Sequence, residues 1–254
     1  MTALYPQIVY GPVHSRRLGI SLGVNLLPLH SKLCTFDCIY CECGWNQPAL
    51  HPLLPSRDEV RQALENQLST SKECLDVITF SGNGEPTLHP DFLGIIQDTC
   101  ALRDMYYPEA KVSVLSNSTQ LGRKDVVEGL MLCDNRILKL DSAIDATMRL
   151  IDKPVNSQLT VKQIVEWLQV FDGDFTLQTC FLRGKYQGQV IDNTTDEELA
   201  AWYEVIDALH PHQVMIYVID RETPLKTLEK IPAEKMEAIA HPLRAKGIDV
   251  VVSV

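Results

Sequence analysis

Short apolar runs alternate with longer amphipathic stretches along most of the chain. Apolar runs bounded by turn residues are typical of buried strands, and apolar residues three or four positions apart are typical of helices. The pattern predicts strands over 20–27, 75–81, 111–116, 137–141, 175–182, 213–219 and 249–253. It predicts helices over 57–71, 91–103, 123–132, 161–171, 196–209 and 233–246, and Ser56 is suited to cap the first of these.

This alternation predicts an α/β fold in which a parallel sheet is built from strands joined by helical crossovers. The chain has 254 residues and contains no linker, repeat or low-complexity segment. That length suits one α/β barrel better than two small domains. We therefore expect a single domain over 1–254, with 1–30 as an N-terminal segment and first strand, followed by a cysteine-rich loop over 31–48.

Polar residues interrupt two of the predicted strands. In the run 138–141, Lys139 and Asp141 are two positions apart and therefore share one face of the strand. Gln178 holds a similar place on the next strand. A charged pair inside a barrel is costly unless it binds a ligand or pairs with a neighbour, so these positions are candidates for a site.

The charge balance and the N-terminus restrict the class of protein. The net charge of −10 does not favour nucleic-acid binding, although residues 1–36 contain no Asp or Glu and carry +3. That segment is either a chance surface patch or the positive rim of a site for anions. No apolar run reaches the roughly 20 residues that span a bilayer, and the N-terminus does not resemble a secretion signal. We therefore expect a cytoplasmic protein that does not associate with a membrane and whose cysteines are reduced.

Four of the eight cysteines are concentrated near the first strand. Cys34, Cys38 and Cys41 have the spacing C-x3-C-x2-C, and three thiolates on one loop can bind three irons of a 4Fe–4S cluster. Cys43 follows after one intervening residue and is poorly placed to reach the fourth iron. Zinc is the main alternative, but structural zinc sites usually join two separated ligand pairs and no second pair is present. The scattered cysteines suit burial, and only Cys180, on a predicted strand, has an open role.

A glycine-rich segment follows the second predicted strand. Gly82, Asn83, Gly84 and Glu85 precede a proline. Glycines let a backbone approach a ligand closely, and carbonyl oxygens with a carboxylate suit an ammonium group. By itself the segment could equally be an ordinary turn.

The cysteine loop, with aromatic Tyr40 before its last cysteine, and the Gly82–Pro86 segment resemble two motifs of the radical S-adenosylmethionine (radical SAM) superfamily. The resemblance covers nearly the whole chain and implies a partial (β/α)6 barrel of the radical SAM type. It also implies two cofactors, a 4Fe–4S cluster on Cys34, Cys38 and Cys41, and SAM. The SAM contacts implied by the resemblance are Tyr40, Gly82, Asn83, Gly84, Glu85, Ser116, Asn117, Asp141, Gln178, Tyr217 and Ile219.

The implied activity is that of an oxidoreductase or transferase-type enzyme. One electron from a donor such as flavodoxin or ferredoxin reduces the cluster, SAM is cleaved to a 5′-deoxyadenosyl radical, and the radical abstracts hydrogen from a substrate. The segments 11–28 and 220–224 resemble the iron–sulfur oxidoreductases grouped with wybutosine-synthesis and molybdopterin-synthesis enzymes. The candidates for binding an anionic substrate are His14, Arg16, Arg17, Arg183 and Arg221, which could instead pair with the many carboxylates.

Several functions remain open at this point. A glycyl-radical-enzyme activating enzyme would have the same cysteine spacing, and a tRNA-modifying enzyme is a further alternative that the acidic charge does not favour. Outside enzymes, an iron–sulfur electron carrier or redox sensor would bind a cluster without cleaving SAM. The sequence identifies neither the substrate, nor whether SAM is consumed or regenerated, nor the oligomeric state.

Overall fold

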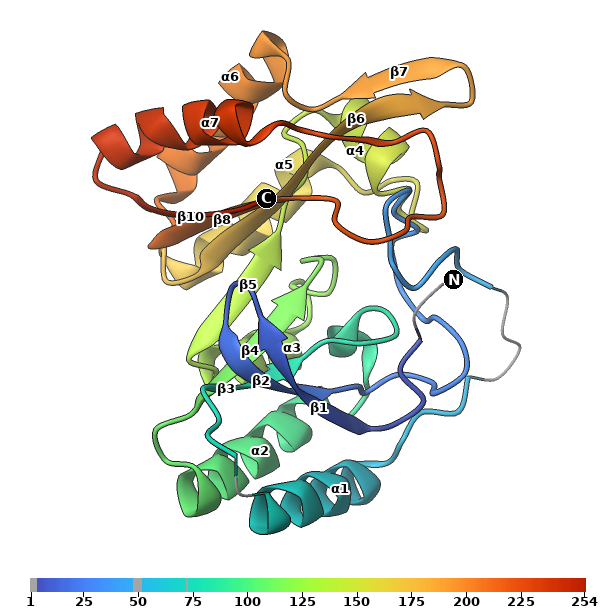
Figure 1. Cartoon of the computed structure of the whole chain (residues 1–254), viewed down its shortest axis with the longest axis vertical. Coiled ribbons are helices and arrows are strands. Elements are labelled where there is room, and N and C mark those ends of the chain that lie inside the picture. The colour runs from blue at the N-terminus through green and yellow to red at the C-terminus, as the bar shows by residue number, and fades with distance from the viewer. Residues whose placement is uncertain (1–3, 48–51, 72) are drawn as a thin grey trace. The chain divides into compact units, whose positions relative to one another are not determined.

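A computed structural model describes residues 4–47, 52–71 and 73–254 (Figure 1). The chain divides into two compact units whose segments interleave in sequence. The N-terminal unit contains Leu4–Cys34 and Asn46–Ile137, and the C-terminal unit contains Thr35–Trp45 and Leu138–Val254. Strand β5 (Asn135–Lys139) crosses the boundary between them.

The sheet of the N-terminal unit has parallel strands in the order in which they occur in the chain. Strand β2 (Gly19–Val24) pairs with β3 (Val77–Phe80), and β3 pairs with β4 (Lys111–Ser116), both in parallel. Val24 is aligned with Phe80, and Phe80 with Val114, so the strands end at the same edge. Residues that follow these strands, including the Gly82–Pro86 segment and Asn117, therefore lie at one edge.

The beginning of this sheet differs from the sequence prediction. An additional strand, β1 (Val9–Ser15), pairs antiparallel with β2, which itself ends at Val24 rather than at residue 27. Asn25 ends the strand because its side-chain amide donates to the Leu27 carbonyl and accepts from the Leu27 N–H, at 3.1 and 3.2 Å. Such a local side-chain turn competes with the sheet for the backbone.

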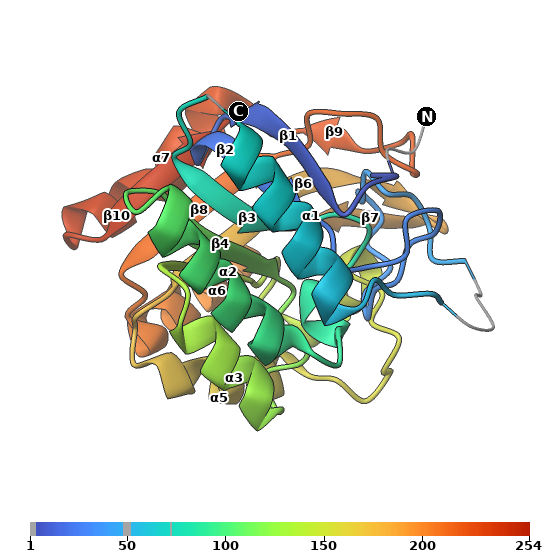
Figure 2. The same ribbon diagram turned by 90° about the horizontal axis from the view of Figure 1, so that it is seen from below.

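Three helices pack side by side against these strands, as Figure 2 shows. They are α1 (Arg57–Thr70), α2 (Phe92–Tyr106) and α3 (Lys124–Met131), and a short 3₁₀ turn, η1 (Pro86–Leu88), follows β3. Ser56 caps α1 as predicted, because its hydroxyl accepts from the Glu59 N–H while the Glu59 carboxylate accepts from the Ser56 N–H.

The C-terminal unit repeats the strand–helix alternation. Its parallel strands are β6 (Thr176–Tyr186), β8 (Gln213–Val218) and β10 (Asp249–Ser253), with β8 paired to both others. Its helices are α4 (Asp145–Ile151), α5 (Val161–Leu168), α6 (Asp196–Leu209) and α7 (Ala233–Ala245), and a 3₁₀ turn, η2 (Gln169–Phe171), extends α5. The helices and strands predicted here are thus present, and α4 is an addition to them.

A small antiparallel extension was also missed. Beyond Leu182, β6 continues to Tyr186 and pairs with β7 (Gln189–Asp192) and with β9 (Glu229–Lys230). The β6–β7 hairpin projects from the unit in Figure 1. The β6 residues beyond Leu182 are exposed or half-buried, so the apolar pattern that predicts core strands is absent from them. No helix among the described residues is both long enough and apolar enough to cross a bilayer.

Candidate functional site

Residues 35–45 of the cysteine loop belong to the C-terminal unit, and the end of α4 and the segment after it hold them in place. The Asp37 N–H donates to the Asp152 carbonyl at 2.8 Å, and the Ile39 N–H donates to the Ile151 carbonyl at 2.9 Å. The Val155 N–H donates in turn to the Thr35 carbonyl at 2.9 Å. These main-chain bonds fix the backbone on both sides of Phe36 and around Cys38, so the unpredicted helix α4 positions the loop.

The rest of this loop is shaped by two turns and an aromatic contact. The Cys41 N–H donates to the Cys38 carbonyl, and the Gly44 N–H donates to the Cys41 carbonyl, at 3.1 and 2.9 Å. Gly44 has a positive φ of 82°, which glycine adopts without steric cost. The loop ends at Trp45, whose ring lies 4.2 Å from the Lys153 ammonium. The same ammonium lies 5.3 Å from the ring of Tyr186 on the hairpin, so a cation–π contact joins loop and hairpin.

A buried group of charges surrounds the Cys38 thiol. The Lys139 ammonium lies 3.1 Å from Cys38 Sγ, 3.1 Å from Asp141 Oδ2, and in direct contact with Asp152 Oδ1. Burial acts to lower the pKa of Lys139, but Asp141 and Asp152 raise it well above its ordinary value. Burial raises the pKa of Asp152 to about 7, against the attraction of Lys139. The predicted pairing of Lys139 with Asp141 is therefore present, and Asp152 was not foreseen.

Asp141 also connects the loop to strand β6. Its Oδ2 accepts from the Tyr40 hydroxyl at 2.5 Å, and its Oδ1 accepts from the Cys180 N–H at 2.9 Å. Burial, followed by the nearby Asp141 carboxylate, raises the pKa of Tyr40 well above its usual value. Burial likewise raises the pKa of the Cys180 thiol, so this thiol stays protonated at neutral pH.

Apolar residues pack beneath the same loop. Ile39 is fully buried with Cys180 and Leu182, and Tyr217 and Ile219 pack against this cluster. Gln178 is also buried, and its amide nitrogen lies 3.5 Å from the Met215 sulfur. The predicted residues Tyr40, Asp141, Tyr217 and Ile219 thus lie in one neighbourhood of the C-terminal unit. Their contact with SAM stays a prediction.

In the N-terminal unit, the Gly82–Pro86 segment is tied to the residues before Cys34. The Leu33 N–H donates to the Asn83 carbonyl at 2.9 Å, and the Glu85 N–H donates to the Leu33 carbonyl at 3.0 Å. Gly84 lies between these two bonds with φ 140°, and a Cβ on it would lie 1.8 Å from the Leu33 carbonyl oxygen. Only glycine fits here, which gives a physical reason for this motif.

The two polar side chains of this segment, Asn83 and Glu85, form hydrogen bonds within the N-terminal unit. The buried Asn83 amide donates to the carbonyls of Tyr5 and Pro28, at 2.9 and 2.8 Å. The Glu85 carboxylate, 2% exposed, accepts from the Ser116 hydroxyl, the Asn117 N–H and both the hydroxyl and N–H of Thr87. Burial raises the pKa of Glu85, while these donors act to lower it.

Asn117 brings a donor to the first cysteine of the loop. Its backbone N–H is held by Glu85 Oε2 at 2.6 Å, and its side-chain Nδ2 lies 3.5 Å from Cys34 Sγ. Glu85 therefore positions Ser116 and Asn117, two of the predicted SAM contacts, through the strand ends that meet at this edge. The sequence could have indicated this role of Glu85, because the Gly82–Pro86 segment and Asn117 each follow one of two adjacent parallel strands.

The predicted substrate residues belong to different units, three to the N-terminal unit and two to the C-terminal unit. His14, Arg16 and Arg17 lie at the β1–β2 turn, since His14 pairs with Ile20 and Ser15 with Gly19. This turn is at the beginning of β2, whereas the Gly82–Pro86 segment follows the end of the neighbouring parallel strand. At about 3.3 Å per residue the six-residue strand separates this turn from the Gly82–Pro86 segment by roughly 20 Å. A role of these three residues in binding a substrate stays a prediction.

The other two arginines are in ion pairs within the C-terminal unit. Arg183 contacts Glu229 at 2.9 Å, and Arg221 contacts Glu42 at 2.8 Å. These are the carboxylate pairings that the sequence left open as the alternative. Arg221 thereby contacts the cysteine loop itself.

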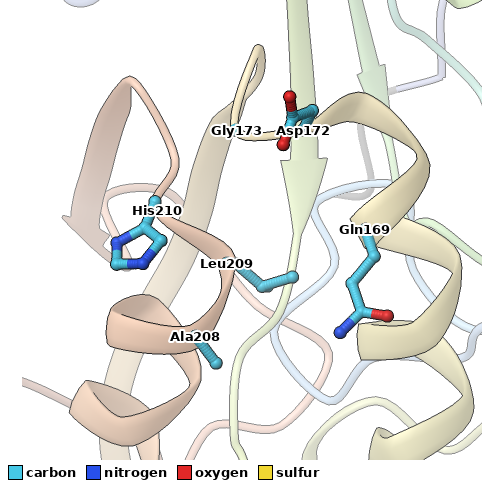
Figure 3. Close-up of a pocket in the computed structure, with 6 residues that line it drawn as sticks. All are labelled: Gln169, Asp172, Gly173, Ala208, Leu209 and His210. Carbon is cyan, nitrogen blue, oxygen red and sulfur yellow. The ribbon is translucent and has the colours of Figure 1, made fainter.

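A cavity of about 160 Å³ is present elsewhere in the C-terminal unit (Figure 3). It lies between η2 and the end of α6, and is lined by Gln169, Asp172, Gly173, Ala208, Leu209 and His210. These residues precede β6 and β8, whereas the sites of α/β barrels lie beyond the carboxyl ends of the strands. The cavity is separate from the candidate site. Among the described residues, no group of three or more His, Cys, Asp or Glu side chains has an arrangement that could hold a metal ion.

Comparisons with known proteins agree with this architecture. Residues 29–173 match the family described as the Radical SAM superfamily. A Helicobacter pylori UPF0026 protein is 30% identical over 87% of this chain and 69% of its own length. A Brachyspira hyodysenteriae protein named GTPase Obg is 30% identical over 90% of this chain, which spans only 32% of that protein.

Solved structures show the same fold. SuiB from Streptococcus suis, bound to S-adenosylmethionine, has a TM-score of 0.64 and 12% identity, covering 88% of this chain and 48% of SuiB. TYW1 with a lysine-pyruvate adduct has a TM-score of 0.61 and 15% identity, covering 89% of this chain and 73% of TYW1. The predicted fold class, a partial (β/α)6 barrel of the radical SAM type, is confirmed.

Proposed function

The chain belongs to the radical SAM superfamily, and we propose that it is an enzyme whose 4Fe–4S cluster is bound by Cys34, Cys38 and Cys41. The observation that carries this proposal is that the family match, residues 29–173, includes both the cysteine loop and the Gly82–Pro86 segment. When bound, the cluster and SAM would supply one-electron cleavage of SAM to a 5′-deoxyadenosyl radical that abstracts hydrogen from a substrate.

The surroundings of two cysteines suit iron ligands. A thiolate is the form that binds metal, and N–H donors beside it stabilise its negative charge. Cys34 Sγ has the Asn117 amide at 3.5 Å, and Cys38 Sγ has the Lys139 ammonium at 3.1 Å. Cys43 follows Cys41 after a single residue, a spacing that reaches the fourth iron poorly, and we leave it outside the ligand set.

Other residues of this chain would orient the cofactors and exclude water. Ile39 and the apolar cluster beneath it shield the loop, and Asp141 fixes the Tyr40 ring through its hydroxyl. Glu85 holds Ser116 and Asn117 at their strand end. The proposed SAM contacts remain those predicted from the sequence, and the SAM bound to SuiB supports the cofactor by analogy of fold.

The partners are part of the same proposal. A one-electron donor such as flavodoxin or ferredoxin would reduce the cluster, and the substrate is unidentified. An anionic substrate would have to compete with Glu229 for Arg183 or with Glu42 for Arg221, because both arginines are paired.

The test is an assay of reductive SAM cleavage. Protein reconstituted anaerobically with iron and sulfide is mixed with SAM and dithionite, and 5′-deoxyadenosine is measured by liquid chromatography and mass spectrometry. We expect 5′-deoxyadenosine from the wild type, none from Cys38→Ala, and most of the wild-type amount from the matched control Cys43→Ala. A fully loaded cluster that yields no 5′-deoxyadenosine would contradict the proposal and favour an electron carrier or redox sensor. Zinc in place of iron, or loss of the cluster from Cys43→Ala, would contradict the ligand assignment.

A further inference from the structure

Three charged residues lie together beside the Cys38 thiol. We call Lys139, Asp141 and Asp152 the Lys139 triad. The side chains are 11%, 0% and 2% exposed, respectively. All three belong to the C-terminal unit, and Lys139 also lies 4.9 Å from the centre of the Phe36 ring. The triad is thus shielded from water, where charge interactions act at their strongest.

The contacts of Lys139 define what its ammonium can do. An ammonium has three N–H donors, and the neighbours of this one include the acceptors Cys38 Sγ, Asp141 Oδ2 and Asp152 Oδ1. Two carboxylates keep it charged. A lysine in this state is neither a base nor a nucleophile, because both roles need a free lone pair on the nitrogen. Lys139 acts instead as a positive charge at a fixed position.

The two carboxylates are held independently of Lys139. Asp141 accepts from the Tyr40 hydroxyl and the Cys180 N–H. Asp152 follows α4, and its carbonyl accepts from the Asp37 N–H, so the backbone bonds of the loop keep it near Cys38. Its Oδ1 lies 3.5 Å from Cys38 Sγ, compared with 3.1 Å for the ammonium. One positive and one negative charge therefore both lie in reach of the same sulfur.

We propose that the Lys139 triad sets the reduction potential of the cluster that Cys38 binds, with Lys139 raising that potential and Asp152 lowering it. This inference rests on the proposed function. Reduction adds one electron to the cluster, taken from an external one-electron donor, and no bond forms or breaks. A nearby positive charge stabilises the added electron and a nearby negative charge destabilises it. Charge and hydrogen bonds at the sulfurs are known means by which a protein tunes such clusters.

The proposal predicts shifts of the reduction potential in opposite directions for the loss of a negative and of a positive charge from the triad. At about pH 9 Asp152, with its pKa of about 7, is ionised, and Asp152→Asn then removes a negative charge. The variant leaves Lys139 paired with Asp141, so its buried charges stay balanced. We expect its potential to rise by at least the equivalent of a tenfold change in the one-electron equilibrium, 59 mV. Lys139→Met removes the positive charge, and we expect the potential to fall by at least as much.

The experiment is a potentiometric titration of each reconstituted protein, followed by the electron paramagnetic resonance signal of the reduced cluster. Lys246→Met and Asp207→Asn serve as matched controls, because this exposed pair, at 2.6 Å, lies in the same unit away from the loop. We expect both controls to match the wild type. Iron and sulfide content is measured first, and a wild type that binds no cluster would overturn the proposed function together with this inference.

The outcomes separate the two proposals. A loaded wild type that cleaves SAM, with Asp152→Asn unchanged or lower in potential, would overturn the role of the triad and leave the proposed function intact. Shifts of Asp152→Asn and Lys139→Met in the same direction would also overturn it, since a purely structural disturbance has no reason to follow the sign of the charge. If Lys139→Met does not retain the cluster, the shift of Asp152→Asn decides.

Discussion

Glu85 links two loops of the N-terminal unit, and its replacement should lower stability even when no cofactor is bound. Its Oε1 accepts from Ser116 and twice from Thr87, and its Oε2 accepts from the Asn117 N–H. In Glu85→Gln the amide oxygen can replace only one of these carboxylate oxygens. If it faces Ser116 and Thr87, the new NH₂ group faces the Asn117 N–H, so two donors meet in a buried place.

The cost can be worked from these contacts. The variant loses one charge-assisted bond and leaves the Asn117 N–H without an acceptor, which costs about 1–3 kcal/mol for a buried donor. We therefore expect about 2 kcal/mol for Glu85→Gln. For a chain of this length 1 kcal/mol corresponds to roughly 2–4 °C in melting temperature, so the expected decrease is about 4–8 °C. Glu85→Ala leaves four donors without their acceptor and should cost more.

The assay is differential scanning calorimetry of the protein without cofactors. Glu109→Gln is the matched control, because it makes the same chemical change in an exposed turn and should shift the melting temperature by less than about 1 °C. If Glu85 served only to bind a ligand, Glu85→Gln would leave the melting temperature unchanged or raise it, as often happens when a binding residue is neutralised. Either result would refute the role of Glu85 as the group that holds these strand ends.

Two further predictions concern stability. Gly84→Ala would place a Cβ 1.8 Å from the Leu33 carbonyl oxygen, so we expect calorimetry to show a loss of well over about 2 kcal/mol in the free energy of unfolding. The control Gly188→Ala has a positive φ but nothing within 4 Å, and should lose only about 1–2 kcal/mol. Equal losses in the two variants would contradict the close approach at Gly84. Lys139→Met should lower the melting temperature of the cofactor-free protein by about 10 °C. Lys139→Met combined with Asp152→Asn should restore part of this loss, because Asp141 stays buried without its cation.

The regular part of the fold could be predicted from the sequence because it is where burial dominates. Strands β4 and β10 and helix α6 have the predicted bounds, 111–116, 249–253 and 196–209. The missed elements lack that signal. Strand β1 contains a glycine and a proline and has no fully buried residue, and α4 has only seven residues, of which Met148 and Ile151 are buried.

The site was predicted only as far as local patterns reach. The shared face of Lys139 and Asp141 follows from the two-residue repeat of a strand. The contact of Asp152 with Lys139 could not be predicted, since it depends on where the segment after α4 crosses the cysteine loop. The place of His14, Arg16 and Arg17 in the fold could not be predicted for a related reason. Without the β1–β2 pairing, the sequence does not show that these residues lie at the opposite end of β2.

The double replacement of Lys139 and Asp152 tests why charges are buried beside Cys38 at all. Removing one member of a buried ion pair leaves an uncompensated charge and typically costs 3–5 kcal/mol, whereas removing both is often neutral, because the desolvation of two ions offsets their attraction. Asp141 would keep its bonds from Tyr40 and Cys180 in the double variant. If the double variant is as stable as the wild type, the triad contributes little net stability, and its position at the thiol then calls for a functional explanation. A double variant as unstable as Lys139→Met alone would instead show that the stability comes from the pairing of Lys139 with Asp141 and not from its pairing with Asp152.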